Sequence, residues 1–305
     1  MPLHHRFFVS LILSLGALPL ALRRFVAKLV GATLGTLPMR DRKIALLQTK
    51  VFLKAPNPSV TVRKVYQNFC LTFLESLNLM PILNHDESTI RFDQWEEFRS
   101  YAADGKGVIY LTAHTGNWEL LAAYMQKHGV DFHALGRQAR HPATQFVLES
   151  VRARYNVRTL WRQDSAGVKE IIRALKRGGG IAALIDQDTN VSSGFANFFG
   201  SPAKTPLALL SLGQKLGCRI CTLFLLREGP SHYRIVCSAL DSSKDVLSIL
   251  QDFNGVLENL VRLNPEQWPW FHKRWRTRPD GSTFSSKEYM RCLEQQPEIF
   301  FKSTP

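Results

Sequence analysis

The chain has 305 residues, of which 45% are hydrophobic and 21% charged, so it has the composition of a folded protein and is long enough for a large core. Its five scattered cysteines do not resemble a disulfide framework and favour a reducing compartment. A net charge of +14 predicts an anionic partner, such as nucleic acid, an anionic membrane surface, a phosphorylated substrate or an acidic carrier protein.

The N-terminal residues form an apolar segment. Residues 7–22 contain only apolar and small side chains and Pro19, with basic residues on both sides. A helix of that length covers about 24 Å, less than the roughly 30 Å of a hydrocarbon core. We therefore expect an uncleaved segment that lies in, or dips into, the cytoplasmic leaflet. A short transmembrane anchor and a buried core helix are the alternatives.

The region from Val30 to about Met80 is predicted to be helical, with a break at Pro56–Ser59. From Gly107 onward, short apolar runs alternate with helical patterns. The predicted strands are Gly107–Ala113, Asp131–Leu135, Val157–Trp161, Ile181–Asp186, Arg219–Leu226 and His232–Ser238. The predicted helices are Trp118–His128, Pro142–Tyr155, Ser165–Arg177, Pro206–Leu216 and Lys244–Leu263.

This alternation predicts an α/β fold, with a largely parallel or mixed central sheet flanked by helices. We expect four parts: a membrane-associating helical segment (1–29), a helical N-terminal part (30–106), an α/β core (107–278) and a C-terminal docking tail (279–305). Cys218 and Cys221 are predicted to be core residues, because no second metal-ligating pair lies nearby. No metal or nucleotide site is expected.

The most informative stretch joins the first α/β strand to its helix and contains His114 and Glu119. Residues five apart cannot share one face of a helix, but they can converge across a strand-to-helix turn. A carboxylate that orients an imidazole makes it a general base for a hydroxyl, and N–H groups around Thr115 to Asn117 suit a developing oxyanion. The alternative is a polar residue at a strand end and a favourable first-turn charge.

Other strand ends also carry functional groups. Arg137 follows the second α/β strand and Asp186 the fourth, so both are expected at the ligand-binding edge of the sheet. Arg137 and Arg154 are candidates for clamping a phosphate or carboxylate, although the pattern around each, taken singly, favours a solvated arginine. Asp186 can orient a substrate hydroxyl, pair with an arginine, help hold a metal, or only form a turn.

Two aromatic stretches remain. Residues 193–200 form a Gly-bounded loop with the composition of a wall for an apolar chain, followed by Thr205 and Pro206 as the predicted start of a helix. Residues 264–276 interleave aromatic and basic side chains, which fits an interfacial surface facing lipid headgroups. For residues 264–276 the alternatives are stacking on single-stranded nucleic acid and ordinary packing. For residues 193–200 the alternative is a loop packed onto the core.

Together these residues resemble one family, the bacterial lipid A biosynthesis acyltransferases of the lysophospholipid acyltransferase superfamily. The resemblance covers nearly the whole chain. It rests on an ordered set of motifs: Ala113-His114-Thr115-Gly116-Asn117-Trp118-Glu119, Asp186-Gln187-Asp188, Phe198-Phe199-Gly200 with Thr205, and Gln267-Trp268-Pro269-Trp270 with Arg274-Trp275.

The resemblance implies an O-acyltransferase that moves a fatty acyl group from acyl carrier protein to a hydroxyl of a lipid A precursor, at the cytoplasmic face of the inner membrane. It implies His114 as the general base and Glu119 as its orienting partner. Arg154 falls near the family's substrate-contacting arginine, with Arg152 as a substitute, and Asp186 matches a positioning aspartate.

The resemblance also bears on substrates and partners. Asn117 and Arg137 are further expected substrate-binding residues, although Gly136-Arg137-Gln138 departs from the aromatic-Arg-Pro of relatives. Because the donor is an activated thioester, no cofactor is expected. The expected partners are acyl carrier protein, anionic membrane lipid and a phosphorylated glycolipid acceptor, and no nucleic acid. The rivals are transfer to another lipid (a lysophospholipid, glycolipid or amino-lipid), a thioesterase, and a non-enzymatic basic protein that binds membranes or nucleic acid.

Overall fold

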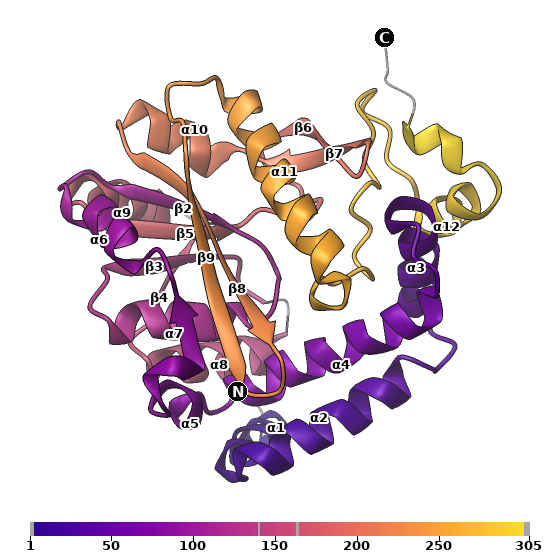
Figure 1. The fold of residues 1–305 in the computed structure, drawn as a ribbon, viewed down its shortest axis with the longest axis horizontal. Coiled ribbons are helices and arrows are strands. Elements are labelled where there is room, and N and C mark those ends of the chain that lie inside the picture. The colour runs from indigo at the N-terminus through magenta and orange to yellow at the C-terminus, as the bar shows by residue number, and fades with distance from the viewer. Residues whose placement is uncertain (1–2, 140, 163–164, 302–305) are drawn as a thin grey trace.

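A computed structural model describes residues 3–139, 141–162 and 165–301 (Figure 1). Its centre is a seven-stranded sheet in the order β1-β9-β8-β2-β5-β3-β4. Every neighbouring pair is parallel except β8 and β9, so the sheet is mixed, as predicted. The strands are β1 (Ile90–Phe92), β2 (Val108–Thr112), β3 (Phe132–Gly136), β4 (Arg158–Trp161), β5 (Gly180–Leu184), β8 (Arg219–Glu228) and β9 (His232–Leu240).

Helices cover both faces of the sheet (Figure 1). The alternation of side chains along β2 shows the two layers: Ile109 and Leu111 belong to one buried cluster, and Val108 and Tyr110 to the other. The helices are α1 (Leu3–Ser14), α2 (Leu20–Leu34), α3 (Arg40–Gln48), α4 (Pro58–Ser76), α5 (Met80–Leu83), α6 (Trp95–Ala103), α7 (Trp118–Lys127), α8 (Pro142–Ala153), α9 (Ser165–Lys176), α10 (Ala208–Lys215), α11 (Val246–Leu263) and α12 (Ser286–Gln295).

The N-terminal helices lie against the rest of the chain, with α2 alongside α4 (Figure 1). Gly31 allows this approach, because a Cβ there would overlap the backbone of Gln67. Buried Arg23 donates hydrogen bonds to the carbonyls of Leu74, in the last turn of α4, and of Asn78, just after that helix. Among the described residues, no helix is both long enough and apolar enough to cross a bilayer.

The predicted strands and helices of the α/β part are confirmed to within a few residues. The aromatic stretch 193–200 is different: it forms a hairpin with strands β6 (Ser193–Phe198) and β7 (Ser201–Pro206). Thr205 therefore lies in a strand, and the predicted helix begins at Ala208. Phe198 and Phe199 are buried in the core, so they form no wall for a ligand.

The C-terminal segments also pack into the core. Trp268, Trp270 and Trp275 are at most 1% exposed, so the expected interfacial surface is instead the packed alternative. The stretch expected as a docking tail contains α12 and supplies buried Tyr289 and Phe300. Residues 302–305 of that expected tail lie outside the described residues. The predicted core positions of Cys218 and Cys221 are confirmed.

Candidate active site

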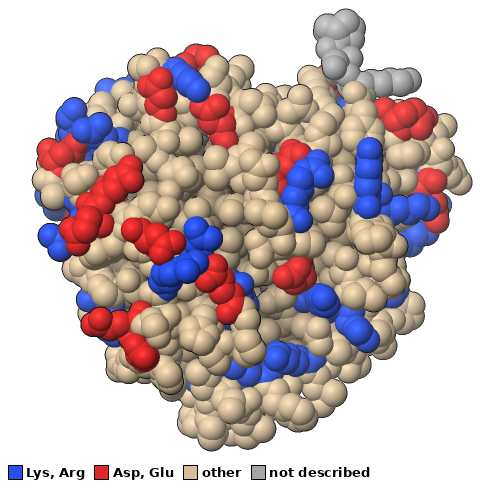
Figure 2. Space-filling view, in the orientation of Figure 1, with Lys and Arg blue, Asp and Glu red and all other residues tan. Residues whose placement is uncertain are grey.

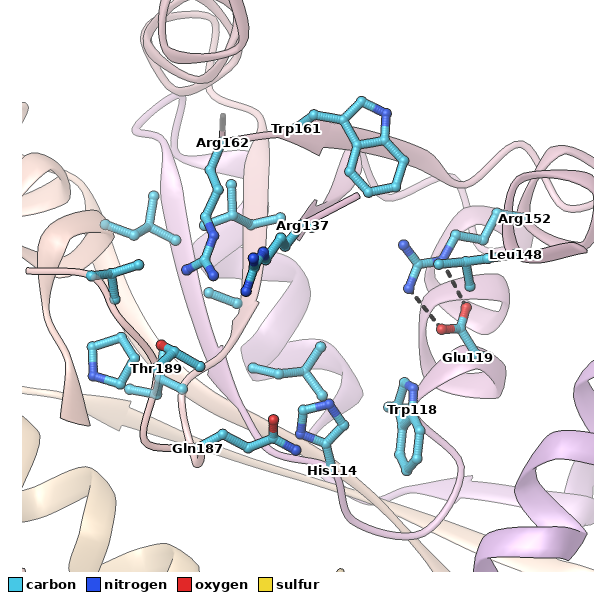
Figure 3. Close-up of a pocket in the computed structure, with 18 of the residues that line it drawn as sticks. His114, Trp118, Glu119, Arg137, Leu148, Arg152, Trp161, Arg162, Gln187 and Thr189 are labelled. Atoms are coloured by element: carbon cyan, nitrogen blue, oxygen red, sulfur yellow. Dashed lines mark hydrogen bonds and ion pairs between the residues drawn. The ribbon is translucent and has the colours of Figure 1, made fainter. Parts of the chain in front are cut away.

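A cavity of about 800 Å³ opens at the carboxyl ends of the parallel strands (Figure 3). Most of its wall is apolar and comes from α4, α8, α9, α10 and the sheet. Its polar side chains include His114, Glu119, Arg137, Arg152, Arg162, Gln187 and Thr189. Ligands bind at this edge of open α/β sheets, and the strand-end prediction for His114 and Arg137 is in agreement with the structure.

His114 is paired with Asp186. Strands β2 and β5 are parallel neighbours, so the residues that follow them meet at one edge. The Nδ1 atom of His114 lies 2.8 Å from Oδ1 of Asp186, and the backbone N–H of His114 donates to Oδ2 at 3.1 Å. Because the carboxylate fixes Nδ1 as the protonated nitrogen, Nε2 is left as the basic atom on a ring that lines the cavity.

The Asp186 carboxylate is fully buried and is held as an anion. Trp268 donates its indole N–H to Oδ2 at 3.0 Å, a contact that no sequence pattern around Trp268 indicated. Burial on its own raises the pKa of Asp186, but the charge of His114 and the hydrogen bonds from His114 and Trp268 outweigh it. The pKa of Asp186 is therefore held below its usual value.

Glu119 does not orient His114, and this prediction is corrected. Both carboxylate oxygens of Glu119 accept from Arg152, at 2.9 Å from Nε and 2.7 Å from Nη2 (Figure 3). The pair lies on the wall of the cavity, and each side chain is 11% exposed. The first turn of α7 faces α8, so the Glu119 carboxylate contacts the Arg152 guanidinium there. The imidazole of His114 instead contacts Asp186, which follows β5.

Two other predicted substrate-binding residues do not reach the cavity. Arg154 donates to the backbone oxygen of Leu77 at 3.0 Å. Arg152, and not Arg154, lies at the cavity wall. Asn117 is fully buried and caps α7, since its side chain accepts from the N–H of Leu120. These two predictions are corrected, because packing of α4 against α7 and α8 uses both side chains.

The turn between β2 and α7 is fixed by its surroundings. Gly116 has a φ of 54°, and a Cβ there would overlap a backbone oxygen of β8. Its N–H donates to the carbonyl of Gln267 at 3.2 Å, and its carbonyl accepts from Thr72 at 2.5 Å. The N–H of Thr115 also has an acceptor, the carbonyl of Ala113. The expected oxyanion role of these two N–H groups is therefore corrected.

Beneath the turn lies a buried ion-pair cluster. Glu75 is 1% exposed and contacts Arg24 at 2.8 Å and Arg227 at 2.6 Å. Burial raises the pKa of Glu75, but the two arginines outweigh it and lower that pKa overall. Glu75 also accepts from Asn117 at 3.2 Å, so the cluster connects α2, α4 and the turn after His114. No sequence motif indicated it.

Arg162 also lines the cavity, although no sequence prediction named it. It follows β4 as Arg137 follows β3, so the strand-end argument applied to Arg137 was sufficient to find it. Among the described residues, no cluster of three or more His, Cys, Asp or Glu side chains has the arrangement of a metal site.

Comparisons with known proteins agree on one family. A family model described as bacterial lipid A biosynthesis acyltransferase matches residues 4–277. The chain is 26% identical to lipid A biosynthesis acyltransferase 2 of Shigella flexneri, over 89% of each chain. It is 28% identical to the lipid A biosynthesis myristoyltransferase of Escherichia coli, over 57% of this chain and 55% of that one. The identity to the lipid A biosynthesis lauroyltransferase of Escherichia coli is 28%, over 61% of each chain.

Proposed function

The chain belongs to the bacterial lipid A biosynthesis acyltransferase family, and we propose that it transfers a fatty acyl group from acyl carrier protein to a hydroxyl of a lipid A precursor. The observation that carries this proposal is the His114–Asp186 pair beside a large apolar cavity. An imidazole with its Nδ1–H held by a buried carboxylate is suited to deprotonate a hydroxyl.

The proposed reaction uses that geometry. His114 Nε2 takes the proton of the acceptor hydroxyl as its oxygen attacks the thioester carbonyl carbon, and the carbonyl becomes an oxyanion. Collapse of this intermediate forms the ester and breaks the C–S bond. The imidazolium then returns its proton to the leaving thiolate. Buried Asp186 stabilises the imidazolium throughout.

In this proposal, the first turn of α7 stabilises the oxyanion. The N–H groups of Trp118 and Glu119 have no acceptor among the described residues. The positive end of the α7 dipole adds to their effect, since this helix begins four residues after His114. The His114 and Trp118 rings are in contact, with their centroids 5.0 Å apart.

Charge and apolar surface support the partners in this proposal. The net charge of +14 favours an acidic carrier protein and a phosphorylated lipid. Helix α2 contains no acidic residues, and the charged atoms visible over it in Figure 2 are basic. Lys28 is its exposed basic residue, whereas Arg23 is buried and Arg24 is paired with Glu75. Phe7, Phe25 and Leu29 are more than half exposed on α1 and α2. Basic and exposed apolar side chains on one helical layer suit the cytoplasmic surface of the inner membrane.

The test is acyl transfer by the purified protein in detergent, with mass spectrometry of the product. Labelled acyl carrier protein thioester is offered with a tetra-acylated lipid A precursor or with a lysophospholipid. We expect a mass gain on the precursor that is abolished in His114→Ala. Transfer to the lysophospholipid alone would overturn the acceptor, and full activity in His114→Ala would overturn the general base.

A further inference from the structure

Two arginines occupy equivalent positions at the ends of neighbouring strands. In the parallel pair β3–β4, Gly136 is the register partner of Trp161, and the next residues are Arg137 and Arg162. The N–H of Arg162 donates to the carbonyl of Gly136 at 3.3 Å, so the pairing continues to this point. The two side chains therefore start from adjacent backbone positions, about one strand spacing (roughly 4.8 Å) apart.

Both guanidinium groups line the cavity, and Figure 3 shows them side by side and pointing into it. Among the described residues, neither has an acidic side chain within ion-pair distance. Arg152 on the opposite wall is different, because Glu119 balances its charge. Burial lowers the pKa of Arg162, and the nearby charge of Arg137 lowers it further. Like charges on adjacent strands destabilise a fold, so stability alone does not explain the pair.

We propose that Arg137 and Arg162 together bind a phosphate group of a substrate in the cavity. Two guanidinium forks on one side of a cavity match the oxygens of a phosphate, and its negative charge removes their mutual repulsion. This inference rests on the proposed function and deepens it. In the sheet order, β3 and β4 lie two and three strands from β2, which places the phosphate roughly 10–14 Å from His114.

Two substrates of the proposed reaction carry such a group. One is the phosphate of a phosphorylated glycolipid acceptor, and the other is the phosphodiester of the pantetheine arm on the carrier protein. The chemistry of recognition is the same for both. Substrates that lack the phosphate distinguish the two sources.

The experiment uses the full chain in detergent and the variants Arg137→Gln and Arg162→Gln. Arg158→Gln is the matched control, because Arg158 is an exposed arginine at the opposite end of β4 and does not line the cavity. Steady-state rates are measured for phosphorylated and dephosphorylated acceptor, and for acyl carrier protein and acyl-pantetheine donors. Arg162→Lys keeps the charge and is the second variant if Arg162→Gln does not fold.

We expect each Gln variant to raise KM for the phosphate-bearing substrate about ten- to hundredfold, as for a lost hydrogen bond between charged groups, with kcat within threefold. Arg158→Gln should match the wild type. Removing the phosphate from the acceptor, or from the donor, should abolish the difference between wild type and variants, and this identifies the source. Unchanged KM values, or equal losses with substrates that lack phosphate, would overturn the proposal.

A binding measurement separates this inference from the proposed reaction. In the His114→Ala background, phosphorylated and dephosphorylated glycolipid are titrated in detergent and binding is followed by the change in tryptophan fluorescence, since Trp161 also lines the cavity. For an acceptor phosphate, Arg162→Gln should weaken binding of the phosphorylated lipid alone. For a donor phosphate, the parallel probes are acyl carrier protein, whose arm carries the phosphodiester, and acyl-pantetheine, which lacks it. The proteins compared are His114→Ala with and without Arg162→Gln. If both bind the phosphorylated glycolipid equally and both bind acyl carrier protein equally, the arginine site is overturned even if acyl transfer is observed.

Discussion

Replacing Asp186 by Asn tests how the imidazole of His114, the proposed general base, is oriented. The carboxylate accepts three hydrogen bonds, two at Oδ2 from the His114 N–H and Trp268, and one at Oδ1 from His114 Nδ1. An asparagine whose oxygen takes the place of Oδ2 keeps the first two. Its NH₂ group then faces Nδ1, which must accept, so the ring proton moves to Nε2. The variant keeps its shape and loses its base.

The size of the effect follows from this change of tautomer and from the loss of the charge that stabilises the imidazolium. We expect kcat to fall about 10³- to 10⁴-fold, which raises the barrier by about 4–5.5 kcal/mol. The KM for either substrate should change little, because Asp186 is fully buried and does not itself line the cavity.

The assay is single-turnover acyl transfer from labelled acyl carrier protein, with the fold checked by circular dichroism. Asp188→Asn is the matched control. Asp188 lies two residues further along the same segment and is also buried, but it accepts from the N–H of Thr277 and has no contact with His114. If Asp186→Asn stayed within tenfold of the wild type while Glu119→Gln lost a thousandfold, the orienting role would belong to Glu119.

Three further outcomes are expected. Glu119→Gln should lower the free energy of unfolding by about 3 kcal/mol in denaturant titrations, and adding Arg152→Met should recover most of it; additive losses would contradict the pairing. Gly116→Ala should cost at least about 2 kcal/mol and most of the activity, because its φ of 54° and the nearby backbone exclude a Cβ; wild-type melting and turnover would refute this. Burial lowers the pKa of His272 to about 4, so between about pH 6.5 and pH 4 this imidazole is protonated in the unfolded chain but neutral in the folded chain. Stability should therefore fall by up to about 3 kcal/mol from pH 6.5 to 4, and His272→Gln should flatten this slope more than His128→Gln does; equal slopes in all three proteins would count against it.

The α/β architecture was predictable because the apolar runs of its strands and the amphipathic pattern of its helices are both clear in the sequence. Strand β2 is an uninterrupted apolar run, buried at every position, and the helices after Gly107 begin or end at recognisable breaks. The β6–β7 hairpin was not predictable in the same way. Its aromatic side chains pack under Trp268 and Trp275, which are about seventy residues further on, and no local signal reports that contact.

The proposed general base was predicted from the sequence, but the residue paired with it in the structure was not. His114 and Glu119 are close along the chain, and a strand-to-helix turn allows them to converge. Whether they do depends on which groups compete for each. Arg152 donates two hydrogen bonds to Glu119 across the α7–α8 contact, and Asp186 is hydrogen-bonded to the imidazole of His114. These two pairs, distant in sequence, form in place of the His114–Glu119 pair.

The order of strands explains both functional pairs. His114, Arg137 and Asp186 each follow a predicted strand, which predicts that they lie at one edge of the sheet. The order of strands along the sequence does not predict which of them are neighbours. Because β5 inserts between β2 and β3, Asp186 lies beside His114, and β3 is left with β4, whose following residue is Arg162. The position of β5 in the sheet thus separates the His114–Asp186 pair from the Arg137–Arg162 pair along the same edge. A substrate that bridges the two needs a phosphate roughly 10 Å or more from the reacting hydroxyl or thioester.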